Sequence, residues 1–104
     1  YKEKNVNILV KKFANYAKKN NLIGLVCSPL EINIVRKEVG KKMILVVPGI
    51  RPNLKSSSKK DDQKRTLTPK KAINLGADFL VIGRPITESP NPLETIKKIN
   101  KSIQ

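Results

Sequence analysis

Two arginines follow short apolar runs that end in turns containing glycine. The runs are "LVVPGIRP", residues 45–52 with Gly49 and Arg51, and "FLVIGRPIT", residues 79–87 with Gly83 and Arg84. A glycine lets an anion approach the backbone N–H closely, because no side chain intervenes. An arginine guanidinium can donate two parallel hydrogen bonds to phosphate oxygens. These residue types in this order predict a binding site for a phosphate group.

A simpler interpretation exists for each turn, in which the glycine only permits a tight turn and the arginine lies on the surface. For either turn alone, this simpler interpretation is favoured. The two apolar runs, however, are predicted to be neighbouring parallel strands, and the carboxyl ends of such strands meet at one edge of the sheet. Arg51 and Arg84 should therefore reach the same place, which favours the phosphate site.

Other reactive groups in the sequence offer weaker candidates. Asp61 and Asp62 form a pair of carboxylates, but adjacent side chains on an extended loop point apart, so solvation of the loop is the better interpretation. Cys27 has no histidine to activate it as a nucleophile, because the sequence contains none,. It is predicted to be a buried strand residue. With no histidine and one thiol, no metal site is expected,.

The composition limits the classes of partner. A net charge of +14, from 22 basic and 8 acidic residues, raises the question of nucleic-acid binding,. The lysines are spread along the chain, and the aromatic residues Phe13, Tyr16 and Phe79 fall at positions expected in a core rather than on a stacking surface. Nucleic-acid binding is therefore not favoured. The sequence has no run of 18 apolar residues, so no membrane span is expected, and its single cysteine fits a reducing cytoplasm,.

Helical and strand patterns alternate along the chain. The expected strands are residues 22–28, 43–47 and 79–82, and a polar loop is expected over residues 53–67,. Four helices are expected, and the first carries Val6 to Ala17. The second begins with a capping box at Ser28-Pro29-Leu30-Glu31, has Leu30, Ile34 and Val35 inward, and ends at Gly40,. The third runs from Thr68-Pro69 to Leu75 and is closed by Gly76, and the fourth begins at Asn91 and has Leu93, Ile96, Ile99 and Ile103 on one side,.

This alternation predicts an α/β fold with a parallel sheet. Three parallel strands cannot close a barrel, but they can be the last three of eight, and a TIM (β/α)8 barrel takes about 250 residues. The fold expected is thus the C-terminal part of such a barrel, about its last three βα units, with residues 1–104 forming a portion of one barrel domain. Tyr1 precedes a helical pattern directly, which suggests a chain cut from something longer.

Three motifs together resemble a known family. "VPGIRP", "DQKRTLTP" and "VIGRPIT", in this order and spacing, are similar to the C-terminal part of the orotidine 5′-phosphate decarboxylase family, and "GLVCS" and "ESPNP" extend the resemblance over nearly the whole chain. The resemblance implies that Arg51, Gln63, Gly83 and Arg84 bind the substrate phosphate. It also implies that Gln63 lies in a lid loop that contacts both phosphate and base.

The resemblance further implies decarboxylation of orotidine 5′-phosphate to UMP in de novo pyrimidine biosynthesis, by a cytoplasmic homodimer without metal or cofactor. The family's catalytic network of Lys and Asp, with the pattern Asp-x-Lys-x-x-x-Asp, is not present in this sequence. No catalytic residue is therefore expected in this segment, and the segment alone is predicted to be inactive. The alternatives are another barrel enzyme that binds a ribose phosphate, and a basic RNA-associated module.

Overall fold

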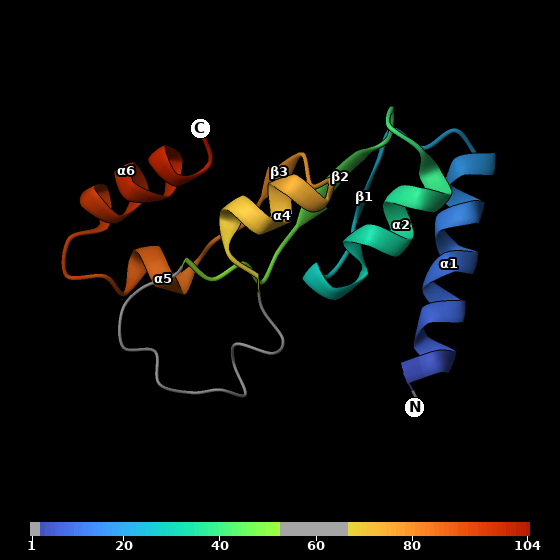
Figure 1. Ribbon diagram of the computed structural model, residues 1–104, viewed down its shortest axis with the longest axis horizontal. Coiled ribbons are helices and arrows are strands. Elements are labelled where there is room, and N and C mark those ends of the chain that lie inside the picture. The colour runs from blue at the N-terminus through green and yellow to red at the C-terminus, as the bar shows by residue number, and fades with distance from the viewer. Residues whose placement is uncertain (1–2, 53–66) are drawn as a thin grey trace.

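The computed structural model of the chain describes residues 3–52 and 67–104, with side chains from residue 6 onward. Its elements, in chain order, are α1 (Glu3–Lys19), β1 (Gly24–Val26), the 3-10 helix η1 (Pro29–Glu31), α2 (Ile32–Val39), β2 (Ile44–Val47), α4 (Pro69–Leu75), β3 (Phe79–Leu80), α5 (Arg84–Thr87) and α6 (Pro92–Ser102) (Figure 1). The loop expected over residues 53–67 lies outside the described residues, except for Leu67.

The strands form one parallel sheet in the order β1-β2-β3. Val46 is paired with Val26 on one side and with Phe79 on the other. The predicted alternation of helices with parallel strands is therefore confirmed. The strands are shorter than expected, and β3 has two residues, although the N–H of Val81 still donates to the carbonyl of Val47 at 3.0 Å.

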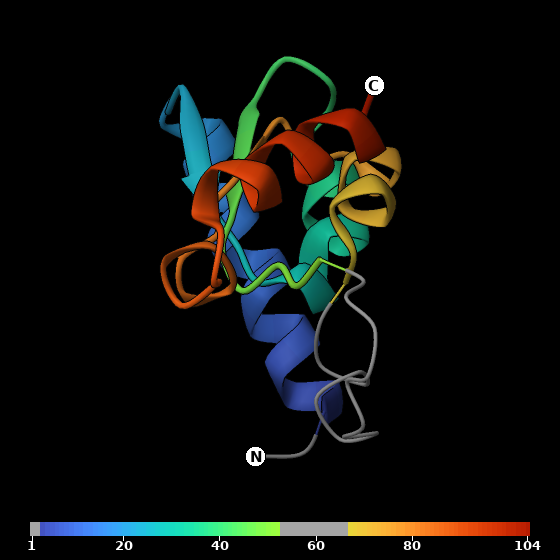
Figure 2. The same ribbon diagram turned by 90° about the vertical axis from the view of Figure 1, so that its left-hand side faces the viewer.

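Helices cover one face of this sheet. Leu45 and Val47 of β2 are fully buried on that face. They belong to a core cluster with residues from three helices: Ala14 and Ala17 of α1, Ile32, Val35 and Val39 of α2, and Ala72 of α4. Figure 1 shows α1 and α2 side by side, and Figure 2 gives the view at right angles. These helices lie against the sheet because each presents its buried apolar side to Leu45 and Val47.

The opposite face of the sheet is apolar and open to solvent. Val26, Phe79 and Val81 have exposed fractions of 71%, 60% and 51%. A parallel sheet normally has both faces covered. In a (β/α)8 barrel the inner face is filled by side chains from the other strands, so an open inner face is what a sector of a barrel should show.

Two of the predicted helix starts are confirmed at atomic detail. At α4, the N–H of Lys71 donates to the side-chain oxygen of Thr68 at 3.3 Å. At α6, the N–H of Glu94 donates to the side-chain oxygen of Asn91 at 3.3 Å. Each cap satisfies a backbone donor that has no partner inside its helix.

The predicted capping box at Ser28 is wrong. Ser28 makes no side-chain cap hydrogen bond, and the chain first forms the 3-10 helix η1 before α2 begins at Ile32. The tighter 3-10 turn changes the direction of the following side chains. Leu30, which was expected to face inward, lies within η1 and is 62% exposed, while Val35 is buried as predicted and Ile34 is half-buried.

The aromatic residues expected in the core are exposed instead. Phe13, Tyr16 and Phe79 have exposed fractions of 61%, 59% and 60%. In the last helix Ile99 is buried, but Leu93 is 62% exposed. These side chains lie on sides of their elements that no described residue covers, so their spacing indicated apolar faces correctly but not what covers them.

The side chain of Arg36 joins the segments that lead into β2 and β3, at the edge of the sheet opposite to the turns that carry Arg51 and Arg84. The guanidinium of Arg36 in α2 donates to the carbonyls of Gly40 and Met43, each at 2.7 Å, just before β2 begins. It also donates to the carbonyl of Gly76, at 3.1 Å from Nε, before β3 begins. One planar group thus joins the chain segments that lead into two neighbouring strands.

Asp78 adds two further contacts at this edge of the sheet. Its carboxylate pairs with Arg36 at 2.8 Å and accepts the N–H of Leu45 at 2.9 Å. Gly76 is the C-cap of α4 with φ 125°, and a Cβ there would lie 3.0 Å from Nε of Arg36. Glycine is therefore required at residue 76, both for the backbone angle and for the approach of the guanidinium.

Candidate functional site

The two candidate arginines follow neighbouring strands at equal distance along the chain. Val47 of β2 pairs with Leu80 of β3 in the parallel register. Arg51 lies four residues after Val47 (47 to 51), and Arg84 lies four residues after Leu80 (80 to 84). Because parallel strands run in the same direction, both arginines leave the sheet at its carboxyl edge.

A buried residue anchors the turn that carries Arg51. Gly49 has φ 76°, a left-handed conformation that glycine adopts without strain, and it follows β2 by two residues,. Ile50 then returns to the core with 2% exposure, which leaves Arg51 on the outside. The N–H of Arg51 donates to the carbonyl of Leu67 at 3.1 Å. The backbone of Arg51 is thus held by the buried Ile50 on one side and by the hydrogen bond to Leu67 on the other.

Arg84 begins the short helix α5 rather than extending a turn, which differs from the expectation. The carbonyl of Gly83 accepts the N–H groups of Ile86 and Thr87, at 2.9 and 3.1 Å. Pro85 occupies the first turn, where it needs no backbone donor,. The Arg84 side chain is exposed, so its guanidinium is accessible from solvent.

Gly83 leaves open space at the carboxyl end of β3. A Cβ built there would meet no atom within 4 Å. Among the residues that the structure describes, the N–H of Gly83 donates to no acceptor. A backbone donor with no side chain in front of it can be approached directly by an anion.

Gln63, the fourth candidate, lies outside the described residues. The two described ends of that part of the chain, Pro52 and Leu67, lie close together because Leu67 accepts the N–H of Arg51. The structure therefore brings Arg51, Gly83 and Arg84 to one edge of the sheet. It gives no position for Gln63.

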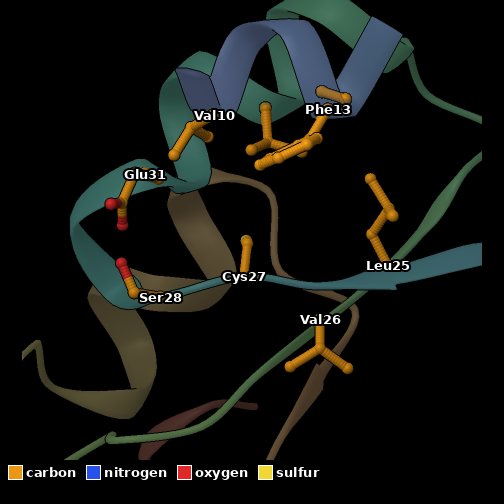
Figure 3. Close-up of a pocket in the computed structure, with 9 residues that line it drawn as sticks. Val10, Phe13, Leu25, Val26, Cys27, Ser28 and Glu31 are labelled. Atoms are coloured by element: carbon orange, nitrogen blue, oxygen red, sulfur yellow. The ribbon is translucent and has the colours of Figure 1, made fainter. Parts of the chain in front are cut away.

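Cys27 lines a cavity of about 240 Å³ on the helix side of β1. Figure 3 shows its thiol directed toward Val10 and Phe13, while Val26 points to the other face. The residue is half-buried, just after β1, and its N–H still donates to Val46 at 3.1 Å. Burial, and secondly the negative charge of Glu31, raise the pKa of the Cys27 thiol. A raised pKa disfavours the reactive thiolate, which agrees with the expectation that Cys27 is not a nucleophile. The expected position was wrong, because Cys27 is half-buried and follows β1 rather than lying buried within the strand.

Sequence reasoning missed two polar features. One is the Arg36–Asp78 pair, which joins residues 42 apart and therefore left no local signal except the glycine at position 76. The other is Glu31, whose Oε2 atom is buried without a hydrogen-bond partner among the described residues. Glu31 was assigned to a capping box that does not form.

The described residues hold no cluster of three or more metal-ligating side chains. None of the helices in the described ranges has the length and apolar character needed to cross a membrane.

The chain is similar to known proteins along most of its length. The family model described as "Orotidine 5'-phosphate decarboxylase / HUMPS family" matches residues 2–99. An orotidine 5′-phosphate decarboxylase from Wolbachia pipientis is 56% identical over 90 residues, covering 86% of this chain and 38% of the relative. One from Actinobacillus pleuropneumoniae serotype 5b is 48% identical over 93 residues, covering 89% of this chain and 39% of the relative.

Solved structures agree with the fold. The orotidine 5′-phosphate decarboxylase of Lactobacillus acidophilus matches with a TM-score of 0.76 and 31% identity, covering 95% of this chain and 38% of that structure. The orotidine 5′-phosphate decarboxylase of Pyrococcus horikoshii matches with a TM-score of 0.70 and 26% identity, covering 93% of this chain and 42% of that structure. These structures are TIM barrels, so the predicted fold, a part of such a barrel, is confirmed. The chain spans about two fifths of the length of the relatives it matches.

Proposed function

Because the chain belongs to the orotidine 5′-phosphate decarboxylase / HUMPS family, we propose that it forms the phosphate-binding portion of an enzyme that converts orotidine 5′-phosphate to UMP. The reaction is a decarboxylation in de novo pyrimidine biosynthesis, and it needs no cofactor. In this proposal residues 1–104 are one portion of a single barrel domain. The complete protein is a cytoplasmic homodimer.

The observation that carries the proposal is the matched position of the two arginines. Arg51 and Arg84 each lie four residues beyond a paired strand residue, at the carboxyl edge where barrel enzymes bind ligands,. Two exposed arginines, together with the N–H of Gly83, which donates to no acceptor among the described residues, supply donors and positive charge for a phosphate dianion,. Neither arginine has an ion-pair partner among the described residues, so both remain available to a ligand.

Gln63 completes the site in this proposal. It belongs to the "DQKR" motif, and the segment that carries it starts and ends next to Arg51. A side chain on that segment can add a contact to the phosphate and to the base once the substrate is bound. Binding of the phosphate would then favour the closed form of the lid.

In this proposal the contacts to the phosphate group contribute to catalysis, although the phosphate itself does not react. Contacts to a remote group supply binding energy that can keep the site closed and free of water while carbon dioxide leaves. A charge-assisted hydrogen bond is worth about 1.5–3 kcal/mol, or roughly 10- to 150-fold at 1.4 kcal/mol per decade. In this proposal the proton donor and the charged network come from other parts of the barrel.

The proposed activity is tested in a complete barrel that contains these residues. Joining them behind the remainder of the Wolbachia relative, which is 56% identical in the matched part, gives such a protein. We expect it to release carbon dioxide from orotidine 5′-phosphate. The change in ultraviolet absorbance measures this reaction. Turnover of a different ribose phosphate, with none of orotidine 5′-phosphate, would contradict the proposal.

A further inference from the structure

We infer that Arg36 is a positioning residue for the phosphate site, although its side chain lies at the opposite edge of the sheet. Together with Asp78 it sets the register of β2 against β3, and this register sets the position of Arg84 relative to Arg51. Arg36 acts through the two strands and not through contact with a ligand. The inference rests on the proposed function, because it assigns Arg36 a role in binding the substrate phosphate.

The strand sequences alone specify the register of β2 against β3 only weakly. β2 reads ILVV, and the chain reads FLVI from the start of β3, so every position is apolar. A shift by one residue turns each side chain to the other face, which is strongly disfavoured only where the two faces differ in polarity. Here both faces are apolar, with Val47 buried under the helices and Phe79 on the open face. A directional contact can therefore select the register where the apolar pattern does not.

Asp78 supplies such a contact at the start of the ladder. Its N–H donates to the carbonyl of Leu45 at 2.9 Å, and its carboxylate accepts the N–H of Leu45, also at 2.9 Å. These two residues come directly before the paired residues Val46 and Phe79. A shift of β3 by one residue would place Ala77 or Phe79 opposite Leu45, and neither side chain has an acceptor,. Only the observed register keeps a carboxylate at the N–H of Leu45.

Arg36 holds this carboxylate and the start of both strands in one arrangement. Its five hydrogen bonds match the five N–H donors of an arginine,. The acceptors are the carbonyls of Gly40 and Met43, before β2, and the carbonyl of Gly76 and the carboxylate of Asp78, before β3. The Arg36 side chain is 17% exposed, so water competes little for these bonds,. A lysine has three donors on one atom and cannot make the same set.

The register reaches the phosphate site because each arginine is tied to its own strand. The residue before Arg51 is the buried Ile50, two residues after Gly49 and the end of β2 come into the turn. The carbonyl of Gly83 accepts N–H groups from the helix that Arg84 begins, directly after β3.

Small errors in the alignment of β2 and β3 should therefore appear at the phosphate. Neighbouring residues of a strand lie about 3.3 Å apart, so a shift by one residue would move one arginine by about this distance relative to the other. In the proposed function both arginines bind one phosphate group. A misplacement of about 1 Å can cost about 100-fold in rate. Loss of the Arg36 contacts should thus weaken the use of a phosphorylated substrate in particular.

The experiment uses the complete barrel in which these residues follow the remainder of the Wolbachia relative. Arg36→Met removes all five donors and keeps a long unbranched side chain. We expect kcat/KM for orotidine 5′-phosphate to fall at least about tenfold, and kcat/KM for the same substrate without its phosphate to change less than about twofold. Arg36→Lys should not restore the loss, because a lysine cannot make the same set of hydrogen bonds. A purely structural role would not distinguish the two substrates.

Two controls separate position from charge. Lys37→Met is the matched control, because Lys37 is the exposed neighbour of Arg36 on α2 and its replacement removes the same charge. It should leave both substrates unaffected. In a barrel that already carries Arg51→Ala and Arg84→Ala, Arg36→Met should cause no further loss, because it acts through these two arginines.

Asp78→Ala gives the same comparison should Arg36→Met fail to fold. It removes the acceptor for the N–H of Leu45 and leaves Arg36 in place. The side chain of Asp78 is 43% exposed, so the barrel should stay folded without it,. Circular dichroism and a thermal melt check the fold of each variant. We expect a smaller loss than in Arg36→Met, again confined to the phosphorylated substrate.

Three results in a folded variant would overturn the inference. They are equal losses on the two substrates, no loss on orotidine 5′-phosphate, and a full further loss when Arg51 and Arg84 are already replaced. Failure of the proposed function gives different results. The unsubstituted barrel would then not decarboxylate orotidine 5′-phosphate, or replacing Arg51 and Arg84 would affect both substrates equally.

Discussion

Arg84 has the most favourable position of the candidate residues. It follows Gly83, where a Cβ would meet no atom within 4 Å, and it precedes Pro85, which restricts the turn,. Arg51 leaves the neighbouring strand at the matched position, so both side chains start at the same edge of the sheet. The phosphate roles of these residues and of Gln63 stay predictions, and each is tested by a single substitution.

Replacing Arg84 by Ala in a complete enzyme should reduce kcat/KM for orotidine 5′-phosphate by about one to two decades, as expected for the loss of a charge-assisted contact. Arg84→Lys should recover part of this loss, because lysine restores the charge but not the two-pronged geometry. Steady-state kinetics on both variants provide the measurement.

The control for Arg84 is a substrate without its phosphate group. Its slow turnover should hardly change in Arg84→Ala, because the guanidinium then has nothing to hold. Equal losses on both substrates would mean that Arg84 supports the fold or the chemistry, and the phosphate role would be wrong.

Replacing Gln63 by Ala should weaken substrate use while leaving the melting temperature nearly unchanged, because a loop side chain with no core contacts contributes little to stability. Kinetics and a thermal melt on the same variant check both parts. A drop of many degrees in the melting temperature would show a structural role for Gln63 instead.

At the level of elements, the site depends on how β2 and β3 are aligned. Arg36 and Asp78 hold the segments that lead into these strands, at the end of the sheet opposite to Arg51 and Arg84. Both strands are short, so the contacts that align β2 and β3 where they begin also align the two strands where they end. The pair thereby supports the matched positions of the two arginines without touching a ligand.

This pair predicts a dependence of stability on pH. The hydrogen bond from the N–H of Leu45, and then the contact with Arg36, lower the pKa of Asp78. A carboxyl whose pKa is lower in the folded state stabilises the fold above its unfolded pKa, roughly 3.9. That stability is lost as pH falls through the folded pKa. The contribution should be below about 1 kcal/mol, since the Asp78 side chain is 43% exposed,.

Asp78→Asn in a complete barrel should therefore unfold at lower urea concentration than the wild type at pH 7. The difference should shrink as pH falls below about 4, where the wild-type carboxyl becomes protonated. Urea unfolding at a series of pH values measures this, with the exposed Glu88→Gln as the control variant. A difference that is the same at all pH values would show that charge is not its cause.

At the level of the whole molecule, the described residues form a sheet with one covered and one open apolar face. The exposed side chains of Val26, Phe79 and Val81 lie where a closed barrel has its packed interior,. The chain also spans only 38% of the Wolbachia relative. Both facts agree with a fold whose sheet is completed by further strands.

The 104 residues by themselves should accordingly be inactive on orotidine 5′-phosphate. They should also show a broad, weakly cooperative unfolding transition, because the sheet keeps open edges and an uncovered apolar face. An activity assay and a urea titration on the purified chain test this. Measurable decarboxylation by the chain alone would contradict the assignment of the chemistry to other parts of the barrel.

The sequence by itself determined the order of helices and parallel strands, the caps at Thr68 and Asn91, the family and the barrel fold. These features depend on short-range information: hydrophobic periodicity, a capping side chain close to its donor, and motifs of a few residues. Gly49 and Gly76 were likewise found because a left-handed backbone angle restricts a position to glycine regardless of distant contacts,.

Only the tertiary structure decided which apolar sides are covered and which polar groups meet. Periodicity marks an apolar side of a helix or strand but not its partner, so Phe13, Tyr16 and Phe79 were wrongly expected in the core. The Arg36–Asp78 contact joins residues 42 apart. The burial of the Glu31 oxygen, which has no hydrogen-bond partner in the part of the chain that the structure describes, depends on packing between α1, β1 and α2. Such contacts arise from how elements pack, and no local pattern in the chain records them.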